Sequence, residues 1–173
     1  MDAANDPQLS PHDEEIVAFW QEARVRGHVS GVDAVTGHTA RDTLPPPAWS
    51  FGGTPEQADA LLALVLDGTK TATAGARWDY EAEGEDLPEP GDLSIVLDGA
   101  GHPRALIAVT DVAVVPFDEV DAEHAALEGE GDLSLSHWRE VHREFFTRFA
   151  VHDKGFRDDM PVVCGRFRVL FQR

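Results

Sequence analysis

The residues best suited to chemistry lie in one short stretch, residues 68–75. Here Lys70 stands among three hydroxyl side chains, those of Thr69, Thr71 and Thr73. The surroundings of a lysine that is fixed at a corner of the backbone can tune its contacts and its charge state. Lys70 is therefore a candidate for a base or for a group that holds an anion. The alternative interpretation is an ordinary exposed lysine near a helix end.

An amphipathic helix precedes this stretch and should position it. Thr54 is expected to be its N-cap, Pro55 its first residue, and Gln57 the residue that closes a capping box. Its apolar residues at helical spacing are Ala58, Leu61, Leu62, Val65 and Leu66. Gly68 can adopt the left-handed conformation that ends a helix, so Lys70 should follow directly from a packed helix.

The length of 173 residues predicts one domain with a single core. Residues 1–10 are polar and acidic without periodicity, which predicts a disordered N-terminus. We assign residues 11–173 to the single domain, with an N-terminal helix and loop in 11–48 and the core in 49–173. The helix itself is expected near 11–26.

The core should combine strands and helices without a regular βαβ rhythm. Predicted strands span 71–77, 93–97, 104–115 and 162–171, with a bend near Asp111 in the third. Predicted helices span 118–126 and a last segment that Ser134 caps, with a buried stripe of Leu135, Trp138, Val141, Phe145 and Phe149. Residues 79–92 are acidic and proline-containing, which predicts a solvated loop. This order indicates an α+β domain around a curled sheet.

Carboxylates gather in the segment Glu128-Gly129-Glu130-Gly131-Asp132, between two predicted helices. A solvated acidic turn is one interpretation of this segment. A divalent-cation loop is another, although the segment lacks the length and the ligand pattern of a calcium hand.

The histidines and the single cysteine do not predict a metal site or a nucleophile. His137 and His142 are five residues apart and fall on different helix faces, while His124 and His152 have no visible partner. We expect these histidines to be solvent-facing or half-buried. Cys164 lies in an apolar run and is expected to be a small core residue. We therefore predict neither a metal nor another cofactor.

Composition narrows the class of partner. The formal net charge is −18, and an acidic surface repels a phosphate backbone, so duplex DNA is not an expected partner. No segment is long and apolar enough to span a membrane, and the N-terminus lacks the pattern of a signal peptide. Together with the lone cysteine, these features predict a cytoplasmic protein.

Four short segments carry a family resemblance. They are Leu66-Asp67-Gly68-Thr69-Lys70-Thr71-Ala72-Thr73, His124-Ala125-Ala126-Leu127-Glu128-Gly129-Glu130-Gly131-Asp132, Trp138-Arg139-Glu140-Val141-His142 and Cys164-Gly165-Arg166-Phe167. In this order they resemble the longer bacterial branch of the ASCH domain family, part of the PUA-like superfamily, from roughly Trp49 to the C-terminus. The resemblance implies a small curled β-barrel flanked by helices.

The resemblance also implies catalytic residues. Lys70 falls on the catalytic or ligand-holding lysine of the family, and Thr73 on its threonine. The offset from His124 places the acidic residue of the family at Glu128 rather than Glu130. Because Lys70 and Thr73 are three residues apart, they converge only if Lys70 lies in the corner before the strand begins.

The sequence departs from the family at one substrate-binding position. Some members have an arginine two or three residues past the threonine, whereas here the next arginine is Arg77. Arg77, Tyr80 or another group would then have to bind the substrate. Thr71 offers a second hydroxyl, because it shares a strand face with Thr73.

The first hypothesis that the resemblance implies is an amidohydrolase for a small acylated nucleoside, as one branch of the family acts on N4-acetylcytidine. Thr73 would attack the amide carbonyl and Lys70 would take its proton. Glu128 would hold the leaving amine or pass it a proton. Thr71 and backbone N–H groups near Gly68 would stabilise the oxyanion.

Two other functions remain open. An RNA-binding or RNA-cleaving domain would hold the phosphate of a short single-stranded RNA with Lys70 and stack a base on Trp78 or Tyr80. The third function is a non-catalytic module that binds a small ligand or a partner. Salt dependence separates the first two, since only RNA binding must weaken steeply with salt.

Overall fold

The computed structural model describes residues 10–27, 29 and 44–173. The disorder expected for residues 1–10 falls almost entirely outside the described residues, and so does most of the loop after the first helix. The elements follow in the order α1 (Pro11–Arg26), β1 (Ala48–Trp49), α3 (Pro55–Leu66), β2 (Ala72–Ala76), α4 (Arg77–Glu83), β3 (Leu93–Leu97), β4 (Pro103–Pro116), the 3-10 turn η3 (Phe117–Glu119), α5 (Ala122–Glu128), α6 (Leu135–Arg148) and β5 (Pro161–Gln172).

The five described strands form one sheet in the order β1-β3-β4-β5-β2. Only the pair of β1 and β3 is parallel, and every other neighbouring pair is antiparallel. The edge strands β1 and β2 do not pair with each other, so the sheet stays open. The α+β class is confirmed, but the closed barrel is wrong, because a two-residue β1 offers too short a ladder to close one.

Most strand predictions are confirmed. β3 has the predicted bounds, and β4 and β5 exceed theirs by one or two residues. The register of β4 against β5 shifts between Val109 and Asp111, where the bend was expected. The predicted strand 71–77 is shorter, and α4 occupies part of the predicted solvated loop. An ion pair between Arg77 and Glu81, one helical turn apart, supports this helix, whose residues include no fully buried side chain.

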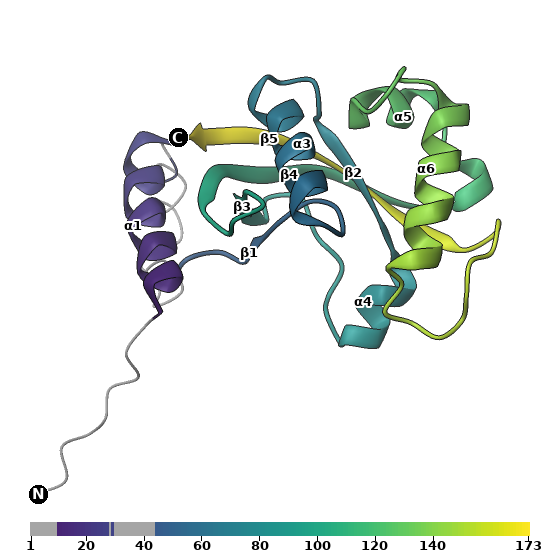
Figure 1. Cartoon of the computed structure of the whole chain (residues 1–173), viewed down its shortest axis with the longest axis horizontal. Coiled ribbons are helices and arrows are strands. Elements are labelled where there is room, and N and C mark those ends of the chain that lie inside the picture. Colours follow the sequence, from purple (N-terminus) through teal and green to yellow (C-terminus); the bar gives the residue numbers. More distant parts are fainter. Residues whose placement is uncertain (1–9, 28, 30–43) are drawn as a thin grey trace, which may run out of the picture.

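Helix α1 confirms its prediction and lies at one end of the sheet, beside the C-terminal end of β5 (Figure 1). Ser10 caps it through a capping box with Asp13, in which each side chain accepts from the other residue's backbone N–H. The helix buries Phe19, Trp20 and Ala23 against the apolar face of β3 and β4.

Helix α3 lies over the middle of the sheet in Figure 1 and leads into the lysine corner. Thr54 accepts the backbone N–H of Gln57, as expected for an N-cap. The Gln57 side chain instead accepts from Gly53, so the predicted capping box does not form. Ala58, Leu62 and Val65 are buried, and Leu62 and Val65 pack in one cluster with Phe51, Val96, Ala105, Ile107 and Phe167.

Helices α5 and α6 lie together at the end of the sheet opposite α1 (Figure 1). Ser134 caps α6 as predicted, but its buried residues are Trp138, His142 and Phe146. The predicted stripe is therefore fully buried only at Trp138. Its other four members are half-buried, and of these Leu135 and Phe145 pack against the core. Phe146 rather than Phe145 is the core residue. The buried face of α6 is displaced by one position from the predicted one, because it includes His142, which hydropathy treats as a polar residue.

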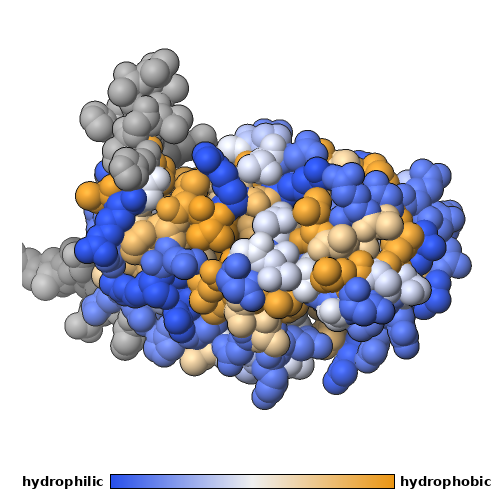
Figure 2. Space-filling view, turned by 90° about the horizontal axis from the view of Figure 1, so that it is seen from above, coloured by the Kyte–Doolittle hydropathy of each residue, from blue (hydrophilic) through white to orange (hydrophobic). Residues whose placement is uncertain are grey.

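The surface of the described chain mixes hydrophobic and hydrophilic residues. Figure 2 shows one face, on which hydrophobic residues are interspersed with hydrophilic ones that dominate the rim. None of the helices in the described part is both long and apolar enough to cross a membrane.

The corrected helix phase predicts the stability of three variants. Leu62→Ala should lower the free energy of unfolding by about 2–5 kcal/mol and Phe146→Ala by about 3–5 kcal/mol, because each leaves a cavity in the core. Phe145→Ala should cost clearly less, because its ring is only partly buried. Urea denaturation of the three variants measures these losses, and an equal or larger loss for Phe145→Ala would reverse the assignment.

Candidate functional site

Backbone hydrogen bonds tie the corner between α3 and β2 to α3 itself and to two other elements, α5 and β5. Gly68 has a φ of 84°, the left-handed value expected at this helix end. The N–H of Lys70 donates to the carbonyl of Leu64 in α3 over 2.9 Å. The N–H of Thr71 donates to Leu127 of α5 over 2.8 Å, and its carbonyl accepts from Phe167 of β5. Lys70 thus lies in the corner before β2 begins, which is the condition for its side chain to point to the same side as that of Thr73.

The side chain of Lys70 is enclosed by acceptors. Only 2% of it is exposed, which excludes the interpretation as an ordinary surface lysine. Its Nζ lies 3.1 Å from Oε2 of Glu128, 3.0 Å from Oε1 of Glu130 and 3.4 Å from the carbonyl oxygen of Glu128. Three acceptors therefore match the three N–H bonds of an ammonium group. The nitrogen also lies 5.3 Å from the ring centre of Phe51.

The carboxylate of Glu128 is held by four groups from three elements. Besides Lys70, Nε2 of His124 lies 3.0 Å from Oε1, Nε1 of Trp138 donates to the same oxygen over 2.8 Å, and Nε2 of His142 lies 3.4 Å from Oε2. Nδ1 of His142 lies 2.9 Å from the carbonyl of Trp138. Both ring nitrogens of His142 thus lie near oxygen atoms, those of Glu128 and of the Trp138 carbonyl.

Glu128 is an anion in this environment. Burial alone would raise its pKa, but the charge of Lys70 and hydrogen bonds from His124 and His142 outweigh that effect. The pKa of Glu128 is therefore held well below its usual 4.5. A carboxyl group with such a pKa positions and stabilises positive charge but carries no proton to give at neutral pH.

Glu130 completes the group and is its most accessible member. About 20% of its side chain is exposed, and a single oxygen contacts Lys70. Gly129 before it has a φ of 73°, and a Cβ there would lie 2.7 Å from the carbonyl oxygen of Thr69. This close approach brings the acidic segment onto the lysine corner, so it is not a purely solvated turn.

Thr73 lies near this group without bonding to it. It pairs with Gly165 of β5, and the side chains of paired residues share a face of the sheet with Phe167, two positions on. The ring centres of Phe167 and Phe51 are 6.0 Å apart, and Lys70 lies beside Phe51, so Thr73 lies on the sheet face that carries this aromatic pair. Within the described part, no hydrogen bond engages the Thr73 hydroxyl.

Gly165, the residue opposite Thr73 on β5, is buried but has room for a side-chain carbon. A Cβ added at Gly165 would meet nothing within 4 Å except the Thr73 methyl group, at 3.8 Å. On the same strand, the ring of Tyr80 covers Gly75, where an added Cβ would lie 3.2 Å from a ring carbon. An added Cβ would therefore be tolerated more easily at Gly165, opposite Thr73, than at Gly75 on the strand of Thr73.

Residues 47–171 match the ASCH domain. The chain belongs to the ASCH family. One similar solved structure is a protein from Enterococcus faecalis V583 assigned to the DUF984 family, at 33% identity and a TM-score of 0.74 over 90% of this chain and 88% of that one. The comparison with curated proteins gave no match.

A second solved structure shares the ASCH fold of this chain. It is the ASCH domain from Lactobacillus crispatus JV V101, at 26% identity and a TM-score of 0.74, over 96% of this chain and 98% of that one. These comparisons establish the family and the fold of the chain.

The other residues predicted for this ASCH site are dispersed. The Thr71 hydroxyl lies 3.5 Å from the Leu127 carbonyl. Arg77 is exposed and paired with Glu81, while Trp78 packs edge-on against His152. In the described part, no hydrogen bond, ion pair or ring contact links Arg77, Trp78 or Tyr80 to Lys70 or Glu128. Burial, with added repulsion from nearby carboxylates, raises the pKa of Tyr80.

Sequence reasoning missed His124, Trp138 and His142 as members of the ASCH site. The expectation of solvent-facing or half-buried histidines is wrong for His124, His142 and His152, all of which are buried. A usable signal was present, because His124 and Glu128 are four residues apart on one helix. Cys164 is half-buried, and burial raises the pKa of its thiol to about 12, so it is no thiolate nucleophile.

The buried ion pair predicts how the ASCH domain responds to single and double substitution. Glu128→Gln should lower the free energy of unfolding at pH 7 by about 3–5 kcal/mol, because it leaves Lys70 buried without its main counter-charge. The double variant Lys70→Met with Glu128→Leu should recover much of that loss, since no buried charge remains. Urea denaturation of both variants tests this, and additive losses would contradict it.

The lowered pKa of Glu128 also predicts a pH dependence. A carboxyl group with a depressed folded-state pKa contributes stability above its unfolded value, and the contribution is lost as the pH falls through the folded-state value. The stability advantage of the wild type over Glu128→Gln should therefore hold from neutral pH to about pH 5 and shrink below 4.5. Denaturation curves from pH 7 to pH 3 measure it, and an advantage unchanged at pH 3 would refute the assignment.

Proposed function

We propose that this ASCH domain hydrolyses the amide bond of a small, uncharged acylated nucleoside of the N4-acylcytidine type. The observation that carries the proposal is a buried lysine bridging two carboxylates, directly before a strand on which the Thr73 hydroxyl has no hydrogen-bond partner among the described residues. Family membership supports it, because the motif positions of the lysine and the acidic residue meet in space. The net charge of −18 also favours a small neutral substrate over a polyanion.

Thr73 supplies the nucleophile in this proposal. Its oxygen attacks the carbonyl carbon of the amide, its proton passes to Lys70, and the C–N bond then breaks as the amine takes up a proton. Water hydrolyses the resulting ester and frees the acid and Thr73. The proposal places the acyl group beside Gly165, where an added Cβ would meet only the Thr73 methyl group within 4 Å.

Lys70 needs a proton acceptor before it can act as the base. The contacts with Glu128 and Glu130 stabilise an ammonium group, which has no lone pair. Glu130 is the suitable acceptor, because it is partly exposed and bonded to Lys70 through one oxygen. Glu128 is held as an anion by its four neighbours, so its role is to hold Lys70 and the leaving amine rather than to pass on a proton.

The oxyanion needs a donor other than the backbone near Gly68. The N–H groups of Gly68, Thr69, Lys70 and Thr71 already donate within the protein. Lys70 itself and the Thr71 hydroxyl, whose contact with Leu127 is long, are the remaining candidates. We assign the role first to Lys70, since its charge is worth most in a buried site.

RNA binding is the second candidate, and one observation favours it. The ring of Trp78 has Lys154 at 4.9 Å and Arg157 at 5.9 Å, a local cationic group on an acidic protein. Both cations are paired with carboxylates, those of Glu81 and Asp159, which weakens their attraction for phosphate. This candidate predicts binding of short single-stranded RNA that weakens steeply as salt is raised.

Substitution at Lys70 and Thr73 tests the hydrolase proposal. Lys70→Arg keeps a charge but cannot usefully deprotonate, so turnover of N4-acetylcytidine should fall by about 10²–10⁴-fold. Thr73→Ala should abolish covalent turnover, while Thr73→Ser keeps a hydroxyl and part of the activity. Thr110→Ala, an exposed threonine on β4, is the matched control and should leave the rate unchanged.

The readouts are release of cytidine and binding of single-stranded RNA at several salt concentrations. Full activity of Lys70→Arg would remove the base role from Lys70. An inactive wild type with salt-sensitive RNA binding would replace the hydrolase proposal by the second candidate.

A further inference from the structure

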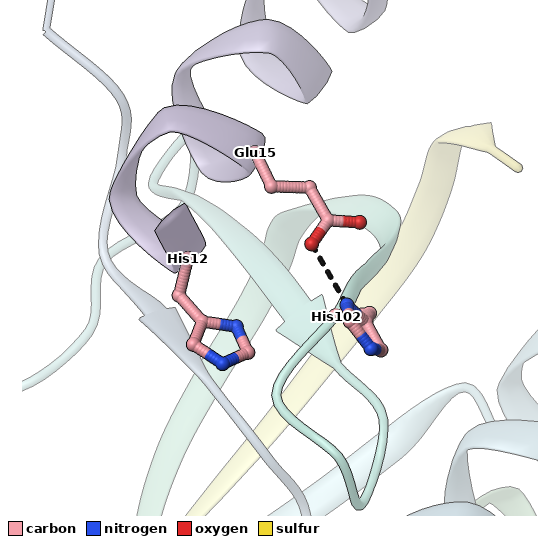
Figure 3. A group of neighbouring side chains, drawn as sticks. All are labelled: His12, Glu15 and His102. Carbon is pink, nitrogen blue, oxygen red and sulfur yellow. Dashed lines mark hydrogen bonds and ion pairs between the residues drawn. The ribbon is translucent and has the colours of Figure 1, made fainter. Parts of the chain in front are cut away.

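A second group of titratable side chains joins the N-terminal helix to the sheet, far from the lysine corner in sequence. His12 and Glu15 lie near the start of α1, and His102 lies in the turn between β3 and β4 (Figure 3). One ligand atom from each side chain lies within 4.8 Å of the other two. Nδ1 of His102 is 2.7 Å from a carboxylate oxygen of Glu15, and the two imidazole rings are 5.6 Å apart.

We propose that His12, Glu15 and His102 bind one zinc ion and thereby fasten α1 to the β3–β4 turn. Two imidazoles and one carboxylate, with water in the fourth position, form a common donor set for zinc. Ligand atoms at about 2.0–2.2 Å from a tetrahedral zinc lie roughly 3.3–3.5 Å from one another. The His102 and Glu15 atoms are closer than this and all three ligand atoms lie within 4.8 Å of one another, so side-chain rotations would bring them onto one ion.

Local structure holds both sides of this group in place before any ion binds. His12 and Glu15 are three residues apart on α1 and so share a face of the helix, whose first turn is fixed by the Ser10 capping box. Across from them, a carboxylate oxygen of Asp98 accepts the backbone N–H of His102 over 2.9 Å. Gly101 has a φ of 87°, and a Cβ there would lie 3.7 Å from the ring of His12.

The charges around this group favour a cation overall. The positive end of the α1 dipole opposes one, and Arg104 lies nearby, paired with Asp98 over 3.4 Å. Nearby carboxylates outnumber these two positive contributions, because the start of the helix carries Asp13 and Glu14 as well as the ligand Glu15. Among the described residues, the other group with metal-ligand geometry is Glu128, Glu130 and His142, but there the ammonium of Lys70 already contacts both carboxylates.

The competing interpretation is an ion pair without metal. The hydrogen bond and charge of Glu15 raise the pKa of His102, so a protonated ring would hold the carboxylate by itself. That arrangement leaves His12 without a role in the contact, whereas a metal site requires all three side chains. The dependence of binding on His12 therefore separates the two interpretations.

Calorimetric titration of chelator-treated, full-length protein with zinc chloride tests the site. One ion per chain is expected, and His12→Ala, Glu15→Gln and His102→Ala should each weaken binding by at least about 10- to 100-fold, the loss that even an outer-shell change causes. Glu14→Gln removes a neighbouring charge without removing a ligand and should bind as the wild type does. Zinc should raise the melting temperature of the wild type and of Glu14→Gln but not of the three ligand variants.

Cobalt substitution provides an independent readout. A four-coordinate site with nitrogen and oxygen ligands should give a visible absorption band that the ligand variants lose. No zinc binding by the wild type, or equal binding by His12→Ala, would overturn the proposal. Loss of binding in Glu130→Gln with retention in the three ligand variants would do the same, by assigning the ion to the buried group.

Discussion

The rest of the site depends on the ion pairs that the Lys70 ammonium forms with the carboxylates of Glu128 and Glu130. Removing these charges from water costs several kcal/mol per ion, and only good geometry with full hydrogen bonding offsets that cost. The protein meets this condition by surrounding Glu128 with Lys70, His124, Trp138 and His142. The lysine corner, α5 and α6 must therefore keep their relative positions, because a shift of any of them would leave a buried charged group without one of its partners.

This requirement explains how the backbone around the site is built. Gly68 turns the chain so that Lys70 leaves α3 toward α5, and Gly129 allows the end of α5 to approach Thr69 closely. The bond from Thr71 to Leu127 closes the same junction from the backbone side. The ion pair lies where the core cluster containing Phe51 approaches the cluster containing Trp138. The site is thus rigid because it is also the joint between two parts of the core.

An element could be predicted from the sequence when the interactions that form it join residues close together in the chain. Caps and strand alternation act over a few residues, so α1, α3, β3 and β5 were predicted from Ser10, Thr54 and the periodic apolar residues. Barrel closure depends on pairing between strands far apart in the sequence. The two-residue length of β1, which keeps the sheet open, has no recognisable sequence pattern. Lys70 and Glu128 were named as site residues through motif resemblance, whereas the phase of α6 failed because His142 is buried for an electrostatic reason, which hydropathy does not register.

The same electrostatics narrow the chemistry open to the site. Glu128 is pinned as an anion, so the charge that moves during a reaction must move on the side of Lys70 and Glu130. Glu130 is the carboxylate that solvent reaches, because Glu128 is 1% exposed and the Glu130 side chain 20%. In the proposed hydrolase, Lys70 would keep its fully buried contact with Glu128 and exchange its proton through the partly exposed contact with Glu130. That proposal thus gives one buried lysine two roles, as the counter-charge of Glu128 and as a proton carrier toward Glu130.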